Sequence, residues 1–360
     1  MNIDINSPLK IVYDKILASE RLSFEDGVTL FNSPDLISIG KMADLVRKRK
    51  NGSNVFYTMN QHINPTNICR NKCLFCAYYR EEGREGAYRM SIETVRSKVL
   101  ERIEEDIREL HIVGALDDGL PYEYYIDIIR EVKKLRPEAS IKAYTAVEIA
   151  YLAERSGKSR RQVLQDLKDA GLQALPGGGA EIFSSRVQSK LFTEKLPAEE
   201  WLEIHQLAHS MDLRTNATML YGHIETIEER AAHLIKLRET QDKSGGFLTF
   251  IPLAFHPENT KIDKLPGPTG VTDLKMIAVS RLMLDNFDHI KAYWIVLGTG
   301  IAQTALSFGA DDIDGSVVEE KIYHMAGSKS AQMMTRSQLE KLIKETGHIP
   351  VERDALYRIM

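Results

Sequence analysis

The feature that most constrains the fold of this chain is a repeated alternation of short apolar runs and amphipathic helical segments. From about residue 50 onward, eight runs rich in β-branched or aromatic residues are each followed by a loop and a helix-like stretch. Such an alternation favours a parallel sheet, because each parallel strand needs a crossover connection. The eight runs span 55–63, 110–116, 141–147, 172–176, 214–221, 247–255, 289–297 and 311–316.

The segments between these runs have helical periodicity, with apolar residues at three- and four-residue spacings. Eight strands, each followed by a helix, predict an α/β fold of the (βα)8 TIM-type barrel, whose active site would lie in the loops after the strands. A doubly wound open sheet is the structural alternative. The predicted helices span 91–110, 122–135, 159–171, 198–211, 226–242, 272–286 and 299–308.

The chain shows no linker rich in Pro, Gly or Ser, which favours one domain with two extensions. Residues 1–50 are predicted to form an N-terminal helical extension, because apolar positions recur with helical spacing in LKIVYDKIL and LISIGKMADLV. Residues 51–316 are predicted to form the barrel. Residues 317–360 are predicted to form a C-terminal helical tail packed on it.

The charge and the N-terminus exclude several classes of protein. Lys and Arg total 47 against 51 for Asp and Glu, so the net charge of -4 gives no basic field for nucleic acid. Charges at Asp4, Lys10, Asp14 and Lys15 interrupt the apolar stretch that a signal peptide requires. No run approaches the roughly 18 apolar residues of a membrane span. We therefore expect a cytoplasmic protein with no nucleic-acid or membrane partner.

The three cysteines of the chain, Cys69, Cys73 and Cys76, lie within eight residues directly after the first predicted strand. They are too few and too close together for a disulfide framework. Three thiolates on one loop can each bind one iron of a 4Fe-4S cubane and leave the fourth iron open. A zinc site completed by His62 is an alternative, since zinc needs a fourth ligand. A non-catalytic iron-sulfur protein is another.

The CxxxCxxC spacing, with Phe75 before the last cysteine, resembles the signature of the radical S-adenosylmethionine (SAM) superfamily. The resemblance implies one 4Fe-4S cluster held by Cys69, Cys73 and Cys76. It also implies that SAM binds the open iron as a co-substrate and is cleaved to methionine and a 5′-deoxyadenosyl radical. A reducing partner such as flavodoxin or ferredoxin would supply the electron. No cysteine remains for an auxiliary cluster.

The same resemblance suggests residues that contact SAM near the cluster. Phe75 and Tyr78 of the cysteine loop are expected beside the cofactor. The string HIVGALDDGLP lies where the superfamily carries a GGE-like motif that receives the methionine amino group, and here Gly114 and Ala115 occupy the two glycine positions. The acidic position of that motif falls on Asp117 or Asp118, and the sequence does not decide between them.

Two acidic residues are expected at the carboxyl ends of the third and fourth strands, where they would project into the active site. Glu148 ends the third predicted strand, and Glu181 follows the fourth in PGGGAEIF. The resemblance favours Glu181 for the ribose hydroxyls of SAM, with Glu148 as the alternative, and Lys195 for the methionine carboxylate.

Candidate substrate-binding residues follow the fourth to sixth predicted strands. His223 and His256 end the fifth and sixth strands, Arg186 follows the fourth and Asn259 follows the sixth, so these four are the predicted catalytic set. Asn216, Thr218 and Tyr293 would line the barrel interior, where core packing is an equally good explanation.

Longer strings resemble the aminofutalosine synthase family of menaquinone biosynthesis, over roughly residues 50–355. They are KAYTAVEIA, PGGGAEIF, TNATMLYGHIET, FIPLAFHPENT, HIKAYWIVLG and GADDIDGSVVEEKIYHMAG. Cyclic dehypoxanthinyl futalosine synthase and the FO synthase subunits share the GGGAE and PENT elements. The HPENT and HMAG strings, with His256 and His324, favour aminofutalosine synthase.

The resemblance to aminofutalosine synthases implies a specific reaction. The adenosyl radical would add to the enol-ether double bond of 3-[(1-carboxyvinyl)oxy]benzoate, and rearrangement and decarboxylation would give 6-amino-6-deoxyfutalosine. The two carboxylates of this substrate need cationic or hydrogen-bonding partners. That requirement favours Arg186 and the histidines as substrate-binding residues.

Overall fold

The strands of this protein form a ring of parallel pairings in a computed structural model that describes residues 8–360. Seven strands form one sheet in sequence order, as expected when each helix returns the chain to the neighbouring position. Their bounds are β2 (Asn60–Ile63), β3 (Glu109–Ile112), β4 (Ser140–Ala143), β5 (Ala174–Leu175), β6 (Arg214–Tyr221), β7 (Phe247–Ala254) and β8 (His289–Ile290).

A second parallel sheet closes the ring, with strand order β10 (Ile349–Glu352), β1 (Asn54–Thr58) and β9 (Asp312–Gly315). Only Met59 separates β1 from β2, so the two behave as one bent strand. A parallel bridge joins Lys291, just after β8, to Asp312 of β9, and Ala292 N donates to Asp312 O at 2.7 Å. These contacts confirm the predicted TIM-type barrel.

Helices follow most strands and bury one apolar face each against the barrel. Several begin with Ser or Thr in a capping box, in which the side chain and the residue three positions later exchange hydrogen bonds, as at Thr145, Ser159 and Thr226. The helices are α4 (Ile92–Leu100), α5 (Tyr122–Leu135), α6 (Ala146–Ser156), α7 (Arg160–Ala170), α8 (Ser185–Leu191), α9 (Ala198–His209), α10 (Ile227–Ser244), α11 (Gly270–Met283), α12 (Trp294–Leu297) and α13 (Thr299–Ala305).

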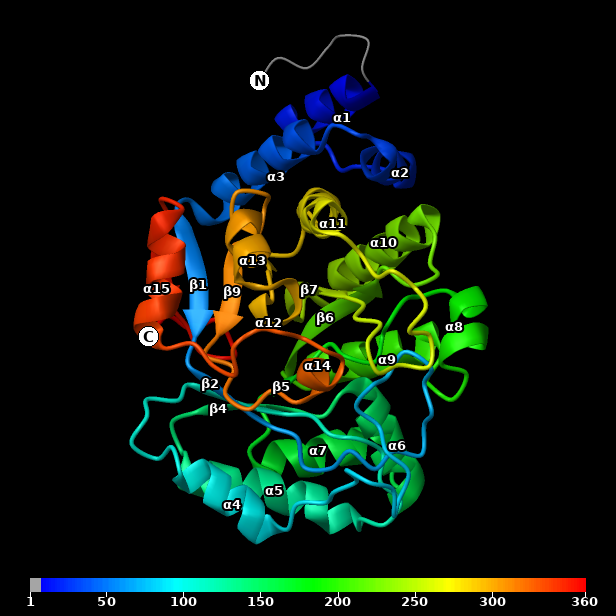
Figure 1. Cartoon of the computed structure of the whole chain (residues 1–360), viewed down its shortest axis with the longest axis vertical. Helices are drawn as coiled ribbons and strands as arrows, with labels where there is room; N and C mark the ends of the chain where they lie inside the picture. Colours follow the sequence, from blue (N-terminus) through cyan, green and yellow to red (C-terminus); the bar gives the residue numbers. More distant parts are fainter. Residues whose placement is uncertain (1–7) are drawn as a thin grey trace.

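The N-terminal extension consists of α1 (Pro8–Leu17), α2 (Phe24–Asn32) and α3 (Leu36–Asn51), which lie together at one end of the molecule (Figure 1). Helix α3 packs on α11, and α2 packs on α10 and α11. The predicted helical lead-in is therefore observed from residue 8, and residues 1–7 lie outside the described part of the chain. No helix among the described residues is long and apolar enough to span a membrane.

The C-terminal tail contains α14 (Ile322–Met325) and α15 (Arg336–Glu345), but it ends in strand β10. The helical prediction for 317–360 missed this strand, which pairs in parallel with β1 from Asn54 opposite Ile349. Four residues carry too little periodicity to predict a strand, and the edge of β1 supplies the partner. The boundaries proposed at residues 50 and 316 remain predictions.

Two predicted strands are shorter than expected, because helices begin inside the predicted runs. The run 141–147 ends as a strand at Ala143, and α6 begins at Ala146 after its cap Thr145. The run 289–297 is a strand only over β8 and then turns into α12. Glu148 consequently lies in the first turn of α6 and not at the end of a strand, which corrects its predicted position.

Candidate functional site

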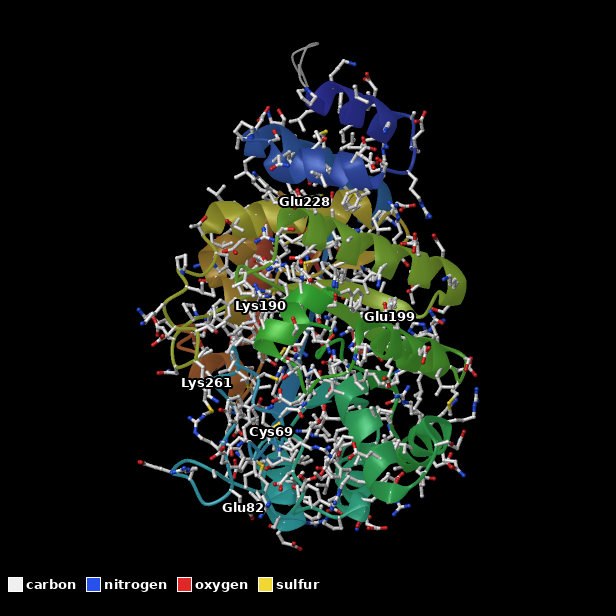
Figure 2. All side chains as sticks on the ribbon, turned by 90° about the vertical axis from the view of Figure 1, so that its right-hand side faces the viewer. Cys69, Glu82, Lys190, Glu199, Glu228 and Lys261 are labelled. Atoms are coloured by element: carbon white, nitrogen blue, oxygen red, sulfur yellow. The ribbon has the colours of Figure 1, made fainter. Side chains whose placement is uncertain are left out.

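A cavity of about 300 Å³ lies inside the barrel, bounded by strand side chains and by the loops that follow the strands. The loop that carries the three cysteines follows β2 and forms part of its wall. Leu74 of this loop accepts from Lys261 N and donates to Leu191 O, both at 2.9 Å. Figure 2 shows Cys69 on the same side of the molecule as Lys190 of α8 and Lys261 of the loop after β7. The cysteines therefore lie at the carboxyl ends of the strands, where active sites of such barrels form.

The cysteine loop is held by backbone hydrogen bonds on both sides. Cys69 N donates to Arg80 O at 3.1 Å, and Arg70 N donates to Leu116 O at 2.9 Å. All three cysteines line the cavity. Burial raises the pKa of each thiol, that of Cys73 to about 12, so the thiolates need a nearby cation such as iron.

Phe75 and Tyr78 also line the cavity, and their place beside the cofactor remains a prediction. The Tyr78 hydroxyl donates to Thr66 O at 2.8 Å and so braces the start of the loop. The Phe75 ring meets Phe192 edge-on at 5.9 Å, and Lys195 Nζ lies 5.3 Å from the centre of the Phe75 ring. These contacts fix the wall between the cysteines and Lys195.

Glu148 supports the segment that was predicted to receive the methionine amino group. Its Oε1 accepts from Gly114 N at 3.1 Å, and its Oε2 accepts from Thr145 N at 2.7 Å. Burial raises the pKa of Glu148 above its ordinary value, although these two backbone donors oppose the shift. Gly114, Ala115 and Glu148 all line the cavity.

Asp117 and Asp118, the two candidates for the acidic position of the GGE-like motif, are absent from the lining of this cavity. Both carboxylate oxygens of Asp117 accept from Arg89 at 2.6 Å, and Thr66 Oγ1 donates to it at 2.9 Å. Asp118 is exposed and accepts from the Tyr151 hydroxyl at 3.3 Å. The buried acid at this position is Glu148 instead, which 34 residues separate from Gly114 in sequence.

Glu181 and Lys195 form a part-buried ion pair in the wall next to the cysteines. Burial lowers the pKa of Lys195, but Glu181 and Cys73 outweigh it, so the net pKa lies above the ordinary value and the ammonium stays charged. Glu181 adopts a positive φ of 46°, and its carbonyl accepts from Leu220 N at 2.8 Å. A non-glycine residue held in this conformation is uncommon and frequently marks a functional site.

Three of the four predicted catalytic residues do not reach the cavity. Arg186 is exposed and makes a bidentate pair with Glu229, with hydrogen bonds of 2.6 and 2.9 Å. The His223 ring pairs with Glu225 at 3.0 Å, and the Asn259 amide donates to Met325 O at 2.9 Å. His256 does line the cavity, with its Nε2 2.9 Å from Val296 O.

The deep end of the cavity carries polar side chains that the sequence analysis did not select as substrate-binding residues. Most of them project from strands, whereas Lys291 and Tyr293 follow β8, and a charged residue in a buried run was the available signal. Burial lowers the pKa values of His62 and His111, so both rings are neutral. Asn216, Thr218 and Tyr293, which were predicted to line the interior, do so. The residues at the deep end are His62, His111, Lys142, Asn216, Thr218, Lys291, Tyr293 and Asp314.

Ion pairs neutralise the charged side chains at and below the deep end of the cavity. Lys142 pairs with Glu109 at 2.6 Å, Arg353 with Asp312 at 2.6 Å, and Lys291 with Asp314 at 3.3 Å. Burial raises the pKa of Glu109, but Lys142 and Arg353 outweigh it and hold the pKa well below its ordinary value. Arg353, which follows β10, therefore closes the barrel below the cavity.

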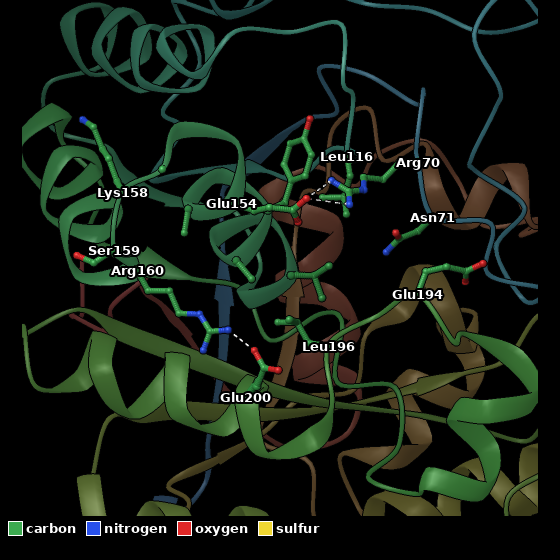
Figure 3. Close-up of a pocket in the computed structure, with 15 residues that line it drawn as sticks. Arg70, Asn71, Leu116, Glu154, Lys158, Ser159, Arg160, Glu194, Leu196 and Glu200 are labelled. Atoms are coloured by element: carbon green, nitrogen blue, oxygen red, sulfur yellow. Dashed lines mark hydrogen bonds and ion pairs between the residues drawn. The ribbon is translucent and has the colours of Figure 1, made fainter.

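A shallower groove of about 600 Å³ lies on the outer side of the cysteine loop (Figure 3). Asn71, Leu116 and Val147 line both this groove and the central cavity, so they form the wall between them. Ion pairs join Arg70 to Glu154 and Arg160 to Glu200 across the groove. Its three basic and three acidic side chains balance, so charge alone selects no partner there.

Comparisons with known proteins assign the chain to a family. Residues 63–237 match the radical SAM superfamily, and residues 244–360 match the CofH/MqnC C-terminal region. The chain is 45% identical to the aminodeoxyfutalosine synthase of Thermus thermophilus, over 96% of this chain and 94% of the relative. It is 43% identical to that of Streptomyces coelicolor, over 96% and 92%. The chain belongs to the radical SAM aminodeoxyfutalosine synthase family.

This family has archaeal relatives with another name. The chain is 36% identical to the 5-amino-6-(D-ribitylamino)uracil--L-tyrosine 4-hydroxyphenyl transferase of Methanoculleus marisnigri, over 98% of both chains. Among solved structures, methylornithine synthase matches with a TM-score of 0.74 at 18% identity, over 94% of this chain and 97% of that one. The hydrogenase maturase HydG matches with 0.76 at 18%, over 97% and 77%. These structures support the barrel fold.

Membership of the radical SAM family implies a 4Fe-4S cluster and SAM, and the donors of this chain fit that cofactor pair. Three thiols on one short loop line the cavity beside the part-buried ammonium group of Lys195. Within residues 8–360, no three His, Cys, Asp or Glu side chains are placed to share one metal ion. A 4Fe-4S cubane does not require three side chains to share one metal ion, because each thiolate binds a different iron atom. The protein is a radical SAM enzyme.

Proposed function

We propose that this enzyme makes 6-amino-6-deoxyfutalosine from SAM and 3-[(1-carboxyvinyl)oxy]benzoate, a step of menaquinone biosynthesis. The observation that carries the proposal is the 45% and 43% identity to two aminodeoxyfutalosine synthases along 96% of the chain. The archaeal transferase is less similar, at 36%. The cavity beside the three cysteines supplies the place for the reaction.

The proposed reaction balances without net consumption of electrons. One electron cleaves SAM to methionine and the 5′-deoxyadenosyl radical, and the cluster, when bound, supplies that electron. The radical carbon bonds to the terminal vinyl carbon, and the resulting radical attacks the aromatic ring and breaks the ether bond to it. The substrate carboxyl group next to the ether leaves as CO2. Loss of this carboxylate as CO2 leaves a ketone and releases one electron, and no proton is gained or lost.

Residues of the loops around the cavity are proposed to bind the cofactors. Cys69, Cys73 and Cys76 each hold one iron of the cluster. Gly114 and Ala115 receive the methionine amino group, since Glu148 holds their backbone in place. These assignments rest on the shared cavity wall and on the superfamily pattern. A flavodoxin or ferredoxin as reductant and a cytoplasmic location also remain predictions.

The pair formed by Glu181 and Lys195 is proposed to bind the two polar ends of SAM. Glu181 accepts hydrogen bonds from the ribose hydroxyls, and Lys195 pairs with the methionine carboxylate. Glu181 is buried and Lys195 is largely buried in the wall next to the cysteines, so they act in a region with little water, where such contacts are strong. Their ion pair also keeps Lys195 charged before SAM arrives.

A second candidate function is the reaction named for the archaeal relatives, the transfer of a 4-hydroxyphenyl group from tyrosine to 5-amino-6-(D-ribitylamino)uracil. The 36% identity over 98% of both chains favours it as the runner-up. The reactions of cyclic dehypoxanthinyl futalosine synthase and of the FO synthase subunits are further alternatives, because residues 244–360 match the CofH/MqnC region. A non-catalytic iron-sulfur or zinc protein is the alternative of a different class.

The fate of the adenosyl group tests the proposal. Anaerobic enzyme with a reductant, the enol-ether benzoate and ribose-labelled SAM should place the label in aminofutalosine, with one methionine per product. Enzymes that abstract hydrogen release labelled 5′-deoxyadenosine instead. Recovery of the label as 5′-deoxyadenosine in proportion to product, or turnover only with tyrosine and the ribitylaminouracil, would contradict radical addition. A metal assay in parallel should find about four irons and no zinc.

A further inference from the structure

Two polar side chains at the deep end of the cavity have no partner in the described part of the chain. His62 Nε2 and Asn216 Oδ1 are buried without a hydrogen bond, and the two residues are only 6% and 1% exposed. Both line the cavity. Buried polar atoms are almost always satisfied in folded proteins, so two orphans on one cavity wall indicate a ligand that completes them.

The His62 ring is held in position by a neighbouring histidine. It stacks on the His111 ring with centroids 4.5 Å apart and planes 11° apart. His111 Nδ1 lies 3.5 Å from Glu109 Oε1, which is a carboxylate acceptor. The His62 ring lacks such an acceptor among the described residues. Its neutral form can therefore present an N–H group to a guest in the cavity.

Lys142 and Lys291 add donors next to these two side chains. Each ammonium group carries three N–H donors. Lys142 contacts Glu109, and Lys291 contacts Asp314 and, at 3.9 Å, Asp312, so each keeps at least one N–H for a guest. Together with the Arg353–Asp312 pair, these two lysine pairs balance three cations against three carboxylates. A guest with a negative charge would meet donors without facing a net negative field.

Strand register places these donors farther inside the barrel than the cysteines. His62, His111 and Lys142 are aligned across β2, β3 and β4, each in the third position of a four-residue strand. The cysteine loop begins only after β2 has ended at Ile63. Apolar walls formed by Ile251, Leu253 and Phe255 complete the cavity. The cavity thus combines a polar floor, an apolar wall and a cysteine-bearing rim.

We propose that this floor, defined as His62, Lys142, Asn216 and Lys291, binds the ring carboxylate of an aryl carboxylate substrate. The enol-ether end of the substrate then points to the rim, where the adenosyl radical forms. The ring carboxylate is retained in the product, whereas the carboxyl group beside the ether is lost, so the retained group is the one suited to a fixed anchor. Holding the vinyl carbon near the radical also favours addition over quenching. The assignment of the enol-ether end rests on the proposed function.

The test compares two compounds that differ only in the anchored group. They are 3-[(1-carboxyvinyl)oxy]benzoate and its ring carboxamide, whose dissociation constants are measured on cluster-loaded enzyme with SAM and without reductant, so that no turnover occurs. His62→Leu should weaken binding of the benzoate by ~10- to 100-fold, the loss typical of one hydrogen bond to a charged group. Binding of the carboxamide should change less than about threefold. His62→Gln, which restores an N–H donor, should recover most of the affinity.

His205 offers a matched control, because it is fully buried and both its ring nitrogens lack a partner among the described residues. It packs on Trp201 and does not line the cavity. His205→Leu should alter neither dissociation constant. If His62→Leu does not fold, Asn216→Leu replaces it in the same comparison, with thermal unfolding as the check.

Several outcomes would overturn the proposal. Equal losses for benzoate and carboxamide would show that His62 does not receive the ring carboxylate, and unchanged affinity for both would remove the floor from substrate binding. Failure of the proposed function is distinguishable: wild-type enzyme would then form no labelled aminofutalosine. In that case 3-hydroxybenzoate serves as the probe, and its binding should still depend on His62. Absence of that dependence would reject the floor as an aryl carboxylate site.

Discussion

The rim and the floor of the cavity satisfy their polar groups in different ways. The rim consists of loop residues and the first turn of α6, and its glutamates already accept hydrogen bonds from the backbone or from Lys195. The floor consists of side chains within strands or directly after them, and it combines balanced ion pairs with the unpaired atoms of His62 and Asn216. We infer that substitutions in the rim mainly affect catalysis, whereas substitutions of the charged floor residues also lower the stability of the fold.

The largest effect should come from the rim, at the cysteines. Cys73→Ser removes one iron ligand, so SAM cleavage should fall to the level without enzyme, and cluster iron should be lost. The free energy of unfolding of the iron-free protein should change by less than about 1 kcal/mol, because the substitution is nearly isosteric. Methionine release, iron content and denaturant unfolding measure the three quantities. Full activity of this variant, or one zinc and no iron in the wild type, would reject the cluster assignment.

A floor charge should instead show its effect in stability. Lys142→Met leaves the buried Glu109 carboxylate without its nearest cation, which should lower the free energy of unfolding by ~3–5 kcal/mol. Lys134→Met, on the exposed side of α5, is the control and should stay within ~0.5 kcal/mol. Denaturant unfolding measures both, and Lys142→Met/Glu109→Gln should recover part of the loss. An unchanged midpoint of denaturant unfolding for Lys142→Met would contradict the stabilising role by which the floor differs from the rim.

The ion pair on the rim should affect SAM binding more than folding. Glu181→Ala removes the proposed acceptor for the ribose hydroxyls, so the dissociation constant of SAM should rise by ~10- to 100-fold. Equilibrium binding on cluster-loaded enzyme measures this change, with the exposed Glu194→Ala, in the loop after α8, as control. Unchanged affinity for SAM would move the ribose role to Glu148.

The smallest effect concerns the segment around His324, which covers the cavity and belongs to neither the rim nor the floor. Glu320 raises the pKa of His324 from 6.5 to about 9. A raised pKa means that the folded state binds the proton more tightly, so the stabilisation is complete below pH 6.5 and is lost as pH rises through about 9. Because the ring is partly exposed, we expect about 1–2 kcal/mol. His324→Gln should flatten stability between these pH values, and a slope identical to the wild type would contradict the assignment.

The site could be predicted where its residues are adjacent in sequence. The three cysteines, Phe75 and Tyr78 belong to one loop, and all five line the cavity. Arg186, His223 and Asn259 were selected because they follow predicted strands, but such residues can turn outward and find surface partners, as Arg186 does with Glu229. Lys142 and Lys291 were missed, because a lysine inside an apolar run does not reveal which way it points until the barrel closes.

The sequence by itself determined the alternation of strands and helices, the barrel class and the cysteine loop, because periodicity and short spacing are local properties of the chain. Tertiary structure alone decided that β10 joins β1, that Glu148 holds Gly114, and that Arg353 pairs with Asp312 below the cavity. Each of these contacts joins residues far apart in sequence. Their energies depend on burial and on partners that exist only once the ring of strands has closed.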